Sequence, residues 1–345
     1  MLKNLFISKP ENVYYLTGFT GSRGMVLLTK GKKYFFTDFR YIEYARNVVP
    51  NSFKVIQIDK QWKKDWPGLI KKLKIKNLGI EENFLTIHQF NELKKISKGV
   101  KLKNSLEAIE NLREIKSNNE FELLKKSQQI NEEILKIVTK KLKPGVTEKQ
   151  IEWLILEQIH SSGADGPSFI PIVAFGDHSS IPHHQNTQRK LQKGDTVLLD
   201  MGVKYKHYCS DMTRTFFTSN PDKLLEKVYS TVLAAQKNAI KSLKPDVQNS
   251  KVNKAANDII KKAGYLENFQ HGLGHGVGLE IHESPNLAAE KPFRLKENMI
   301  TTIEPGIYLK NHFGVRIEDM VKITRAGYEN FTKAPKELKD IILKI

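Results

Sequence analysis

Residues 271–283 read His-Gly-Leu-Gly-His-Gly-Val-Gly-Leu-Glu-Ile-His-Glu. Three histidines and four glycines in thirteen residues are not the composition of a hydrophobic core. Glycine permits close backbone approach and unusual dihedral angles, and imidazole is a common metal ligand and proton carrier near neutral pH. We therefore interpret this segment, with His271, His275 and His282, as part of a functional site.

Four acidic residues in the same half of the chain stand at the ends of predicted strands. Asp200 ends an apolar run that begins at residue 196, and Asp211 follows a polar turn, so a hairpin would bring the two carboxylates together. Glu304 follows the apolar run 299–303, and Glu318 lies in the short run 315–319. Any one of them could point to solvent, but four at once are better explained by a shared site. Buried and unpaired, each would cost several kcal/mol, so we predict that a cation compensates them.

The predicted donors are four carboxylates and one imidazole, that of His275. Such an oxygen-rich set favours Mn²⁺, with Co²⁺, Fe²⁺ or Zn²⁺ as alternatives, and differs from sulfur-rich structural zinc sites. Five side chains, some of them bridging, suit two divalent metal ions about 3.5–4 Å apart, which lower the pKa of a bound water. Hydrolysis would then need no thiol, and we expect the single cysteine, Cys209, to be a small buried residue.

Length and composition predict a two-domain globular protein. The chain has 345 residues, 39% of them hydrophobic and 27% charged, which excludes a disordered tail, a collagen-like fibre and a coiled coil. No run approaches the roughly 18 apolar residues of a membrane span. Lys9 and Pro10 follow the start too soon for a signal peptide, and one cysteine cannot form an internal disulfide. We expect a cytoplasmic protein without a membrane partner.

The net charge of +18 raises the possibility of nucleic-acid binding. Only nine of the 56 basic residues are arginine, however, and arginine is the residue favoured for base readout and bidentate phosphate recognition. The lysines occur as scattered pairs on the polar faces of predicted helices. We interpret them as solvated surface and expect no nucleic-acid partner.

The predicted elements divide the chain at residue 113. Residues 1–113 combine strand-like runs at 13–16, 25–28 and 34–37 with helical spacing at 62–75 and 86–96, which predicts a small α/β domain. A capping box of Ser117 and Glu120 then opens a helix, and Thr147 with Gln150 opens another. Two further helices, 221–243 and 249–264, are separated from hairpin-linked strands. Residues 114–345 therefore form a second domain, and the fold class is α+β.

The order of these residues resembles the pita-bread metallopeptidase family, which includes methionine aminopeptidase, aminopeptidase P and prolidase. Segments 211–215, 303–308 and 314–319 are similar to its proline-specific branch, and the resemblance covers about residues 105–325. Segments 15–22 and 37–41 resemble the small creatinase-type N-terminal domain of Xaa-Pro peptidases. Bacterial methionine aminopeptidases lack that domain, which argues against the methionine-specific function.

The resemblance implies a role for each metal ligand. Asp200 would chelate one metal ion, His275 and Glu304 the other, and Asp211 and Glu318 would bridge the two. A metal-bridging hydroxide would attack the carbonyl before proline, with Glu304 as the proton shuttle.

The resemblance also implies residues that contact substrate. His282 would hydrogen-bond the developing tetrahedral centre, His183 would be a second substrate histidine, and His271 would line the proline side of the pocket. Arg316 would support the metal carboxylates. Relatives often have proline or glycine after the residue matched by His183, whereas this chain has His184, so either histidine could face the substrate.

We therefore predict an Xaa-Pro aminopeptidase that acts on peptides with proline at the second position, as a homodimer. Segment 19–22 and the short N-terminal domain favour aminopeptidase P over prolidase, the Xaa-Pro dipeptidase, which is the alternative. A non-catalytic binding module of the same fold is a further alternative, and a creatinase-like hydrolase that does not use the metals is another. Retention of all five ligands argues against both.

Overall fold

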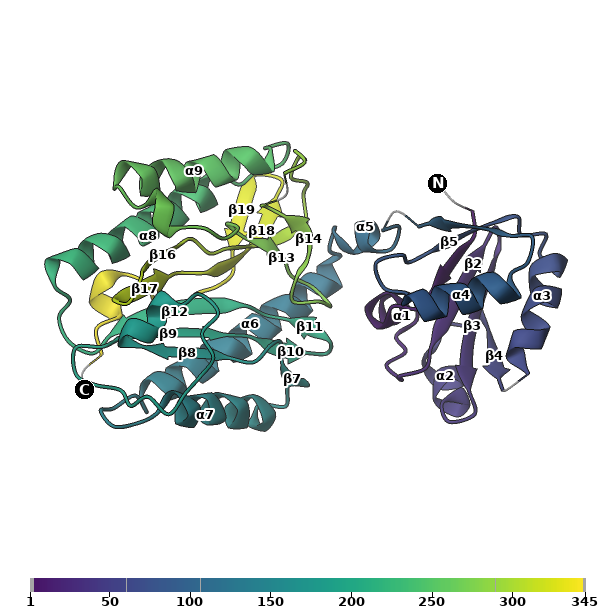
Figure 1. Ribbon diagram of the computed structural model, residues 1–345, viewed down its shortest axis with the longest axis horizontal. Helices are drawn as coiled ribbons and strands as arrows, with labels where there is room; N and C mark the ends of the chain where they lie inside the picture. The colour runs from purple at the N-terminus through teal and green to yellow at the C-terminus, as the bar shows by residue number, and fades with distance from the viewer. Residues whose placement is uncertain (1–2, 60, 106, 289, 344–345) are drawn as a thin grey trace. The chain divides into compact units, whose positions relative to one another are not determined.

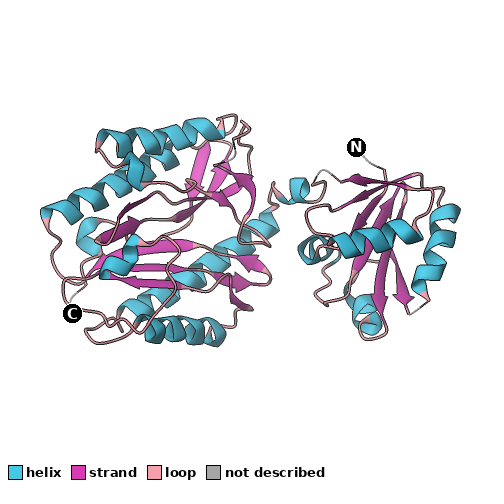
Figure 2. Ribbon diagram, viewed as in Figure 1, coloured by secondary structure: helices cyan, strands magenta, loops and turns pink. Residues whose placement is uncertain are grey.

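The computed structural model describes residues 3–59, 61–105, 107–288 and 290–343. The chain divides into two compact units, Met1–Arg113 and Glu114–Ile345. Figures 1 and 2 show that both units combine helices with strands. The α+β class predicted from the sequence is confirmed.

The N-terminal unit is built on a six-stranded mixed sheet of order β4-β3-β2-β1-β5-β6. Its strands are β1 (Leu5–Ile7), β2 (Met25–Thr29), β3 (Lys32–Asp38), β4 (Phe53–Ile58), β5 (Asn77–Ile80) and β6 (Lys101–Asn104). Its helices are α1 (Pro10–Thr17), α2 (Ile42–Val48), α3 (Trp62–Lys72), α4 (Ile87–Ile96) and α5 (Glu110–Arg113). Tyr34 and Phe36 of β3 pack in one core with Trp66 of α3, whereas Phe35 packs in the other with Val13 of α1. The sheet is therefore covered on both faces, as the alternation of side chains along a strand requires.

The strand predicted at 13–16 is wrong, because these residues lie in helix α1. Pro10 occupies the first turn, where its missing N–H costs nothing. Gly18 ends the helix with φ of 72°, and its N–H bonds the carbonyl of Tyr14. Val13 and Thr17, one turn apart, are both buried. The hairpin predicted around Gly31 is confirmed, since β2 pairs with β3 there.

The C-terminal unit contains four long helices and small antiparallel sheets of orders β12-β9-β8, β11-β10-β7, β14-β13-β15-β18-β19 and β16-β17. Figure 1 shows α6 and α7 on one side of the strands and α8 and α9 on the other. The helices are α6 (Asn118–Thr139), α7 (Glu148–Ser161), α8 (Lys223–Ser242) and α9 (Asn249–Lys262), with short 3₁₀ turns η1 (Gly176–Ser180), η2 (Leu266–Asn268) and η3 (Leu338–Asp340). The strands are β7 (Gly166–Pro167), β8 (Ile172–Phe175), β9 (Thr196–Met201), β10 (Val203–Tyr205), β11 (Tyr208–Cys209), β12 (Met212–Phe217), β13 (His275–Gly276), β14 (Glu283–Asn286), β15 (Ile300–Ile303), β16 (Gly306–Leu309), β17 (Phe313–Arg316), β18 (Asp319–Thr324) and β19 (Gly327–Asn330).

One apolar core joins the helices of this unit to its strands. It includes Ile134 of α6, Ile155 of α7, Val232 of α8, Leu199 of β9 and Ile303 of β15. Both predicted capping boxes are present at the start of α6 and α7. The helices and the strands thus pack around one shared core, and the strand ends carry the residues considered next. No helix within the described part of the chain is long and apolar enough to cross a membrane.

Candidate metal centre

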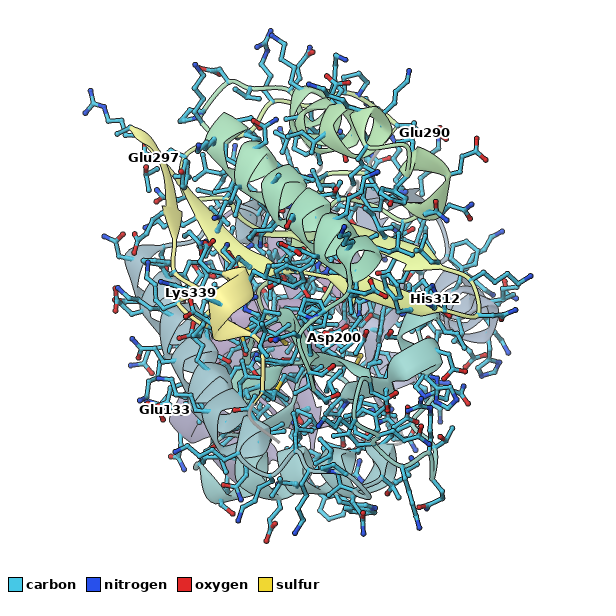
Figure 3. All side chains as sticks on the ribbon, turned by 90° about the vertical axis from the view of Figure 1, so that its left-hand side faces the viewer. Glu133, Asp200, Glu290, Glu297, His312 and Lys339 are labelled. Atoms are coloured by element: carbon cyan, nitrogen blue, oxygen red, sulfur yellow. The ribbon has the colours of Figure 1, made fainter. Side chains whose placement is uncertain are left out.

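A cavity of about 670 Å³ lies within the C-terminal unit. The structure brings all the sequence-predicted site residues to its wall: Asp200, Asp211, His275, Glu304, Glu318, His183, His271, His282 and Arg316. The wall also carries the apolar side chains Phe169, Ile170 and Ile172. Figure 3 shows Asp200 in the middle of the view, with Glu133 and His312 nearer the edge of the molecule. Residues from position 169 to position 318 of the sequence therefore share one cavity.

Asp200 and Asp211 reach the cavity through strands β9 and β12. These strands pair antiparallel with Thr213 opposite Asp200, and Asp211 comes directly before β12. Between them the chain turns back through β10 and β11, with Lys206 and His207 both at positive φ. Two such residues form the tight turn that matches strand twist in a hairpin. The hairpin predicted between the two aspartates is confirmed.

Glu304 and Glu318 are placed by the pairing of β15 with β18. Ile303, the last residue of β15, lies opposite Asp319, the first residue of β18. Glu304 follows β15 and Glu318 precedes β18, so both lie at the same end of this strand pair. Thr302 donates a hydrogen bond to Glu304 at 3.2 Å, and Thr213 donates one to Glu318 at 2.7 Å. The two glutamates thus converge on the aspartates from the opposite sheet.

His275 faces these carboxylates from the start of β13. Its Nε2 lies 3.4 Å from Glu304 Oε1 and 3.6 Å from Asp211 Oδ2. Its Nδ1 lies 3.1 Å from the carbonyl of Gly276, so Nδ1 carries the proton and Nε2 presents a lone pair. Burial, with a contribution from His282, lowers the pKa of His275 to about 4. A neutral imidazole held by a backbone carbonyl is the form in which histidine binds metal.

Gly274, the residue before His275, allows this approach. A Cβ on Gly274 would lie 2.0 Å from the carbonyl oxygen of Thr302, which is part of β15. Because backbone of a paired strand cannot move aside, only glycine fits here. Two of the glycines of the quoted segment have this role, since a Cβ on Gly276 would lie 2.3 Å from the carbonyl oxygen of Ser284.

The carboxylate cluster needs more positive charge than the protein provides. Burial and the neighbouring carboxylates raise the pKa of Asp211 and Glu318 well above their usual values. Burial raises the pKa of Glu304 to about 7, although the Arg316 guanidinium opposes it. Asp200 Oδ1 is buried and has no hydrogen-bond partner among the described residues. Fully ionised, the four carboxylates would carry three negative charges more than the single Arg316 guanidinium balances. Asp211, His275 and Glu318 offer ligand atoms within 4.8 Å of one another. The residues therefore fit divalent metal ions.

A chain of hydrogen bonds behind the cluster runs from Asp200 to His271. Arg316 donates to Asp200 Oδ2 at 2.7 Å and to the Tyr308 hydroxyl at 2.8 Å. That hydroxyl lies 3.0 Å from His271 Nε2, while His271 Nδ1 lies 2.9 Å from the carbonyl of Gly272. The carbonyl can only accept, so Nδ1 carries the proton and the tyrosine donates to Nε2. Burial, reinforced by the Arg316 charge, lowers the pKa of His271 to about 4, so this imidazole is neutral.

The two remaining histidines of the cavity differ from His184. His183 and His282 are exposed and line the cavity, whereas His184 is buried and its Nε2 lies 2.9 Å from Glu148. Of the two adjacent histidines, His183 is therefore the one that faces the cavity. Cys209 is buried, and burial raises the pKa of its thiol to about 11, which agrees with the inert role predicted for it.

Sequence reasoning missed Tyr308 and Glu148. Tyr308 lies in segment 303–308, which resembles the family, but the resemblance assigns a role only to Glu304 of that segment. A tyrosine four residues after a predicted ligand was the available signal. Glu148 had no distinguishing signal, because an acidic residue in the first turn of a helix is common for helix stability alone.

Comparison with known proteins gives one matching family model for each unit. The family model for metallopeptidase family M24 matches residues 122–325, and that for the creatinase/prolidase N-terminal domain matches residues 1–115. An Xaa-Pro dipeptidase of Pyrococcus horikoshii is 34% identical over 335 residues, which cover 97% of this chain and 93% of that protein.

Two solved structures extend this similarity to the whole fold. An Xaa-Pro dipeptidase from Bacillus anthracis has a TM-score of 0.95 at 35% identity, and the match covers 99% of this chain and 95% of that protein's chain. An X-Pro aminopeptidase from Thermotoga maritima MSB8 has a TM-score of 0.90 at 31% identity, and the match covers 97% of this chain and 96% of that protein's chain. The chain belongs to metallopeptidase family M24, with a creatinase-type N-terminal domain before a pita-bread catalytic domain.

Proposed function

We propose that this chain is a dinuclear-metal exopeptidase that cleaves the bond between a first residue and a following proline, and that its principal substrates are Xaa-Pro dipeptides. The observation that supports it most is the convergence of five ligand-type side chains with His183, His271 and His282 on one cavity. The aminopeptidase P function predicted from the sequence becomes the second candidate. Two of the three relatives described above are Xaa-Pro dipeptidases, including the more similar of the two solved structures.

Asp200, Asp211, His275, Glu304 and Glu318 would hold the two ions. The donor set favours Mn²⁺ because four of the five donors are carboxylates, which suit hard cations. Two bound cations supply a water of lowered pKa and polarise a peptide carbonyl. The division of the chain at residue 113, with a catalytic domain from 114 to 345, and the homodimer are parts of the same proposal.

The side chains around the ions orient the substrate. His271 is neutral, and its two ring nitrogens are engaged by the Gly272 carbonyl and the Tyr308 hydroxyl, so neither is free to exchange a proton with substrate. An uncharged ring on the cavity wall suits the apolar proline ring. His282 and His183 are exposed on the cavity wall and can donate hydrogen bonds to substrate oxygens. Arg316 holds Asp200 through a bond of 2.7 Å and so fixes that carboxylate for its ion.

The test is a substrate panel assayed on chelator-treated protein with and without added Mn²⁺. The panel contains an Xaa-Pro dipeptide, an Xaa-Pro-Yaa tripeptide and a Met-Ala-Ser control. We expect metal-restored cleavage of the dipeptide and much slower cleavage of the tripeptide. Preferential cleavage of the tripeptide would establish the aminopeptidase P function instead. Cleavage of the control alone would contradict both, and cleavage of no peptide would favour the non-catalytic binding module.

A further inference from the structure

Glu148 is a fully buried carboxylate outside the metal centre, at the first position of α7. Five donors surround it. Oε1 accepts from the Phe175 N–H at 3.0 Å and from His178 Nδ1 at 2.8 Å. Oε2 accepts from His184 Nε2 at 2.9 Å and from the N–H and hydroxyl of Thr187 at 2.9 and 2.7 Å. Since a carboxylate can only accept, both imidazoles donate to it.

These hydrogen bonds show that Glu148 holds the neighbouring loop residues in place and does not form a metal site. Glu148, His178 and His184 have ligand atoms within 4.8 Å of one another, but the acceptor sites of the carboxylate are already filled by N–H and O–H groups. Burial raises the pKa of Glu148, and the hydrogen bonds from His184 and Thr187 outweigh it and bring the pKa to about 2. The carboxylate is therefore ionised at neutral pH and binds its donors through charge-assisted hydrogen bonds.

The anchored segment is the one that carries His183 into the cavity. On one side of His183, the Pro182 carbonyl accepts from Arg316 at 3.3 Å. On the other side, the His184 ring is held by Glu148. Two residues after His184, Asn186 donates to Glu152 at 2.9 Å. Glu152 lies one helical turn after Glu148, on the same face of α7. Both neighbours of His183 are thus fixed, while His183 itself is exposed on the cavity wall.

We propose that Glu148 is a positioning residue: by holding His184 and Thr187 it fixes the turn 181–187, and it thereby directs His183 toward the substrate. The proposal rests on the proposed peptidase function for its kinetic consequence. The ordering of the turn can be measured without any activity.

The first experiment is hydrogen exchange of segment 175–187 in the full chain, in wild type and in Glu148→Gln. The Thr187 amide donates to Glu148 and the His184 amide to the Ile181 carbonyl, so both should exchange at least about tenfold faster in the variant. Glu132→Gln is the matched control, because Glu132 is a buried carboxylate of α6 that accepts from the Lys333 N–H away from this turn. Unchanged exchange in Glu148→Gln, or an equal change in the control, would overturn the proposal.

The second experiment is a double-mutant cycle with Mn²⁺-loaded protein and the dipeptide substrate. We expect Glu148→Gln to lower kcat/KM about tenfold in wild type and less than about twofold in the His183→Ala background. An equal loss in both backgrounds would mean that Glu148 does not act through His183, and it would overturn the proposal. A wild type that cleaves no peptide would defeat the proposed function, while hydrogen exchange would still decide whether Glu148 orders the turn.

Two variants of His184 cover the case in which Glu148→Gln does not fold. His184→Phe keeps a buried ring without a donor, and His184→Gln keeps a donor near the Nε2 position. We expect the phenylalanine variant to reproduce the tenfold loss and the glutamine variant to recover most of it. Equal activities of the two variants would contradict the proposal. A third Mn²⁺ or Zn²⁺ ion per wild-type chain, lost in His184→Phe, would instead identify a metal site and overturn it.

Discussion

Replacement of Tyr308 by phenylalanine removes one hydroxyl from the hydrogen-bond chain behind the metal centre. That hydroxyl accepts from Arg316 at 2.8 Å and lies 3.0 Å from His271 Nε2. The change leaves a buried guanidinium N–H and an imidazole nitrogen without this partner, while the ring and its packing stay. We expect Tyr308→Phe to weaken both the fold and the orientation of His271.

The magnitude follows from the two bonds that are lost. A hydrogen bond to a charged group contributes about 1.5–3 kcal/mol and a neutral one about 0.5–1.5 kcal/mol, which together give about 2–4.5 kcal/mol. For a unit of the size of residues 114–345, each kcal/mol lowers Tm by about 2–4 °C, so we expect a decrease of at least about 4 °C. If about 1.4 kcal/mol of this lost stabilisation also raises the activation free energy of peptide hydrolysis, kcat/KM falls about tenfold.

The assay is thermal unfolding and dipeptide hydrolysis of Tyr308→Phe beside Tyr229→Phe. Tyr229 is buried in the same unit and its hydroxyl donates one neutral bond to the Lys336 carbonyl at 2.8 Å. The control should lose only about 0.5–1.5 kcal/mol and keep its kcat/KM. Equal effects of the two variants on kcat/KM, or an unchanged Tm for Tyr308→Phe, would refute the reasoning.

Three further changes test other parts of the structure. His275→Ala or Glu304→Ala should abolish turnover and leave circular dichroism unchanged, and wild-type kinetics in either variant would contradict the site. Because the pKa of Glu148 lies at about 2 in the folded chain and at the usual 4.5 when unfolded, its stabilisation is complete above pH 4.5 and is lost as the pH falls toward 2. Urea unfolding of metal-free protein should therefore show the advantage of wild type over Glu148→Gln shrinking by up to about 3 kcal/mol between pH 6 and pH 2, and a constant difference would argue against an ionised carboxylate. Gly274→Ala should lose metal affinity, because its Cβ would lie 2.0 Å from strand backbone. The control Gly68→Ala lies in open space inside α3 and should raise the free energy of unfolding by up to about 1 kcal/mol. Equal metal affinities and equal Tm values of the two variants would contradict this account.

Much of the fold could be predicted because local signals agreed with the tertiary structure. The capping boxes at Ser117 and Thr147 mark the starts of α6 and α7. Helix α1 could not be recognised in the same way. Its apolar run at 13–16 is too short for periodicity to separate a helix from a strand, and the deciding features were Pro10 and the turn at Gly18.

The metal centre could be predicted from residue type and position, but its surroundings could not. Carboxylates at strand ends and a glycine-flanked histidine point to a site because they are costly in a core without a cation. The links from Tyr308 to His271 and from Glu148 to His184 depend on strand register and on the path of a loop. Neither is encoded in a short segment, so only the structure distinguishes His183 from His184.

The most direct test of the central claim is a titration of chelator-treated protein with Mn²⁺, in which bound metal and Xaa-Pro hydrolysis are measured on the same samples. Asp200, Asp211, His275, Glu304 and Glu318 are the donors in question. We predict that activity returns with metal binding and reaches its maximum at about two ions per chain. Full activity of the metal-free protein, or two bound ions without cleavage of any Xaa-Pro peptide, would contradict the claim.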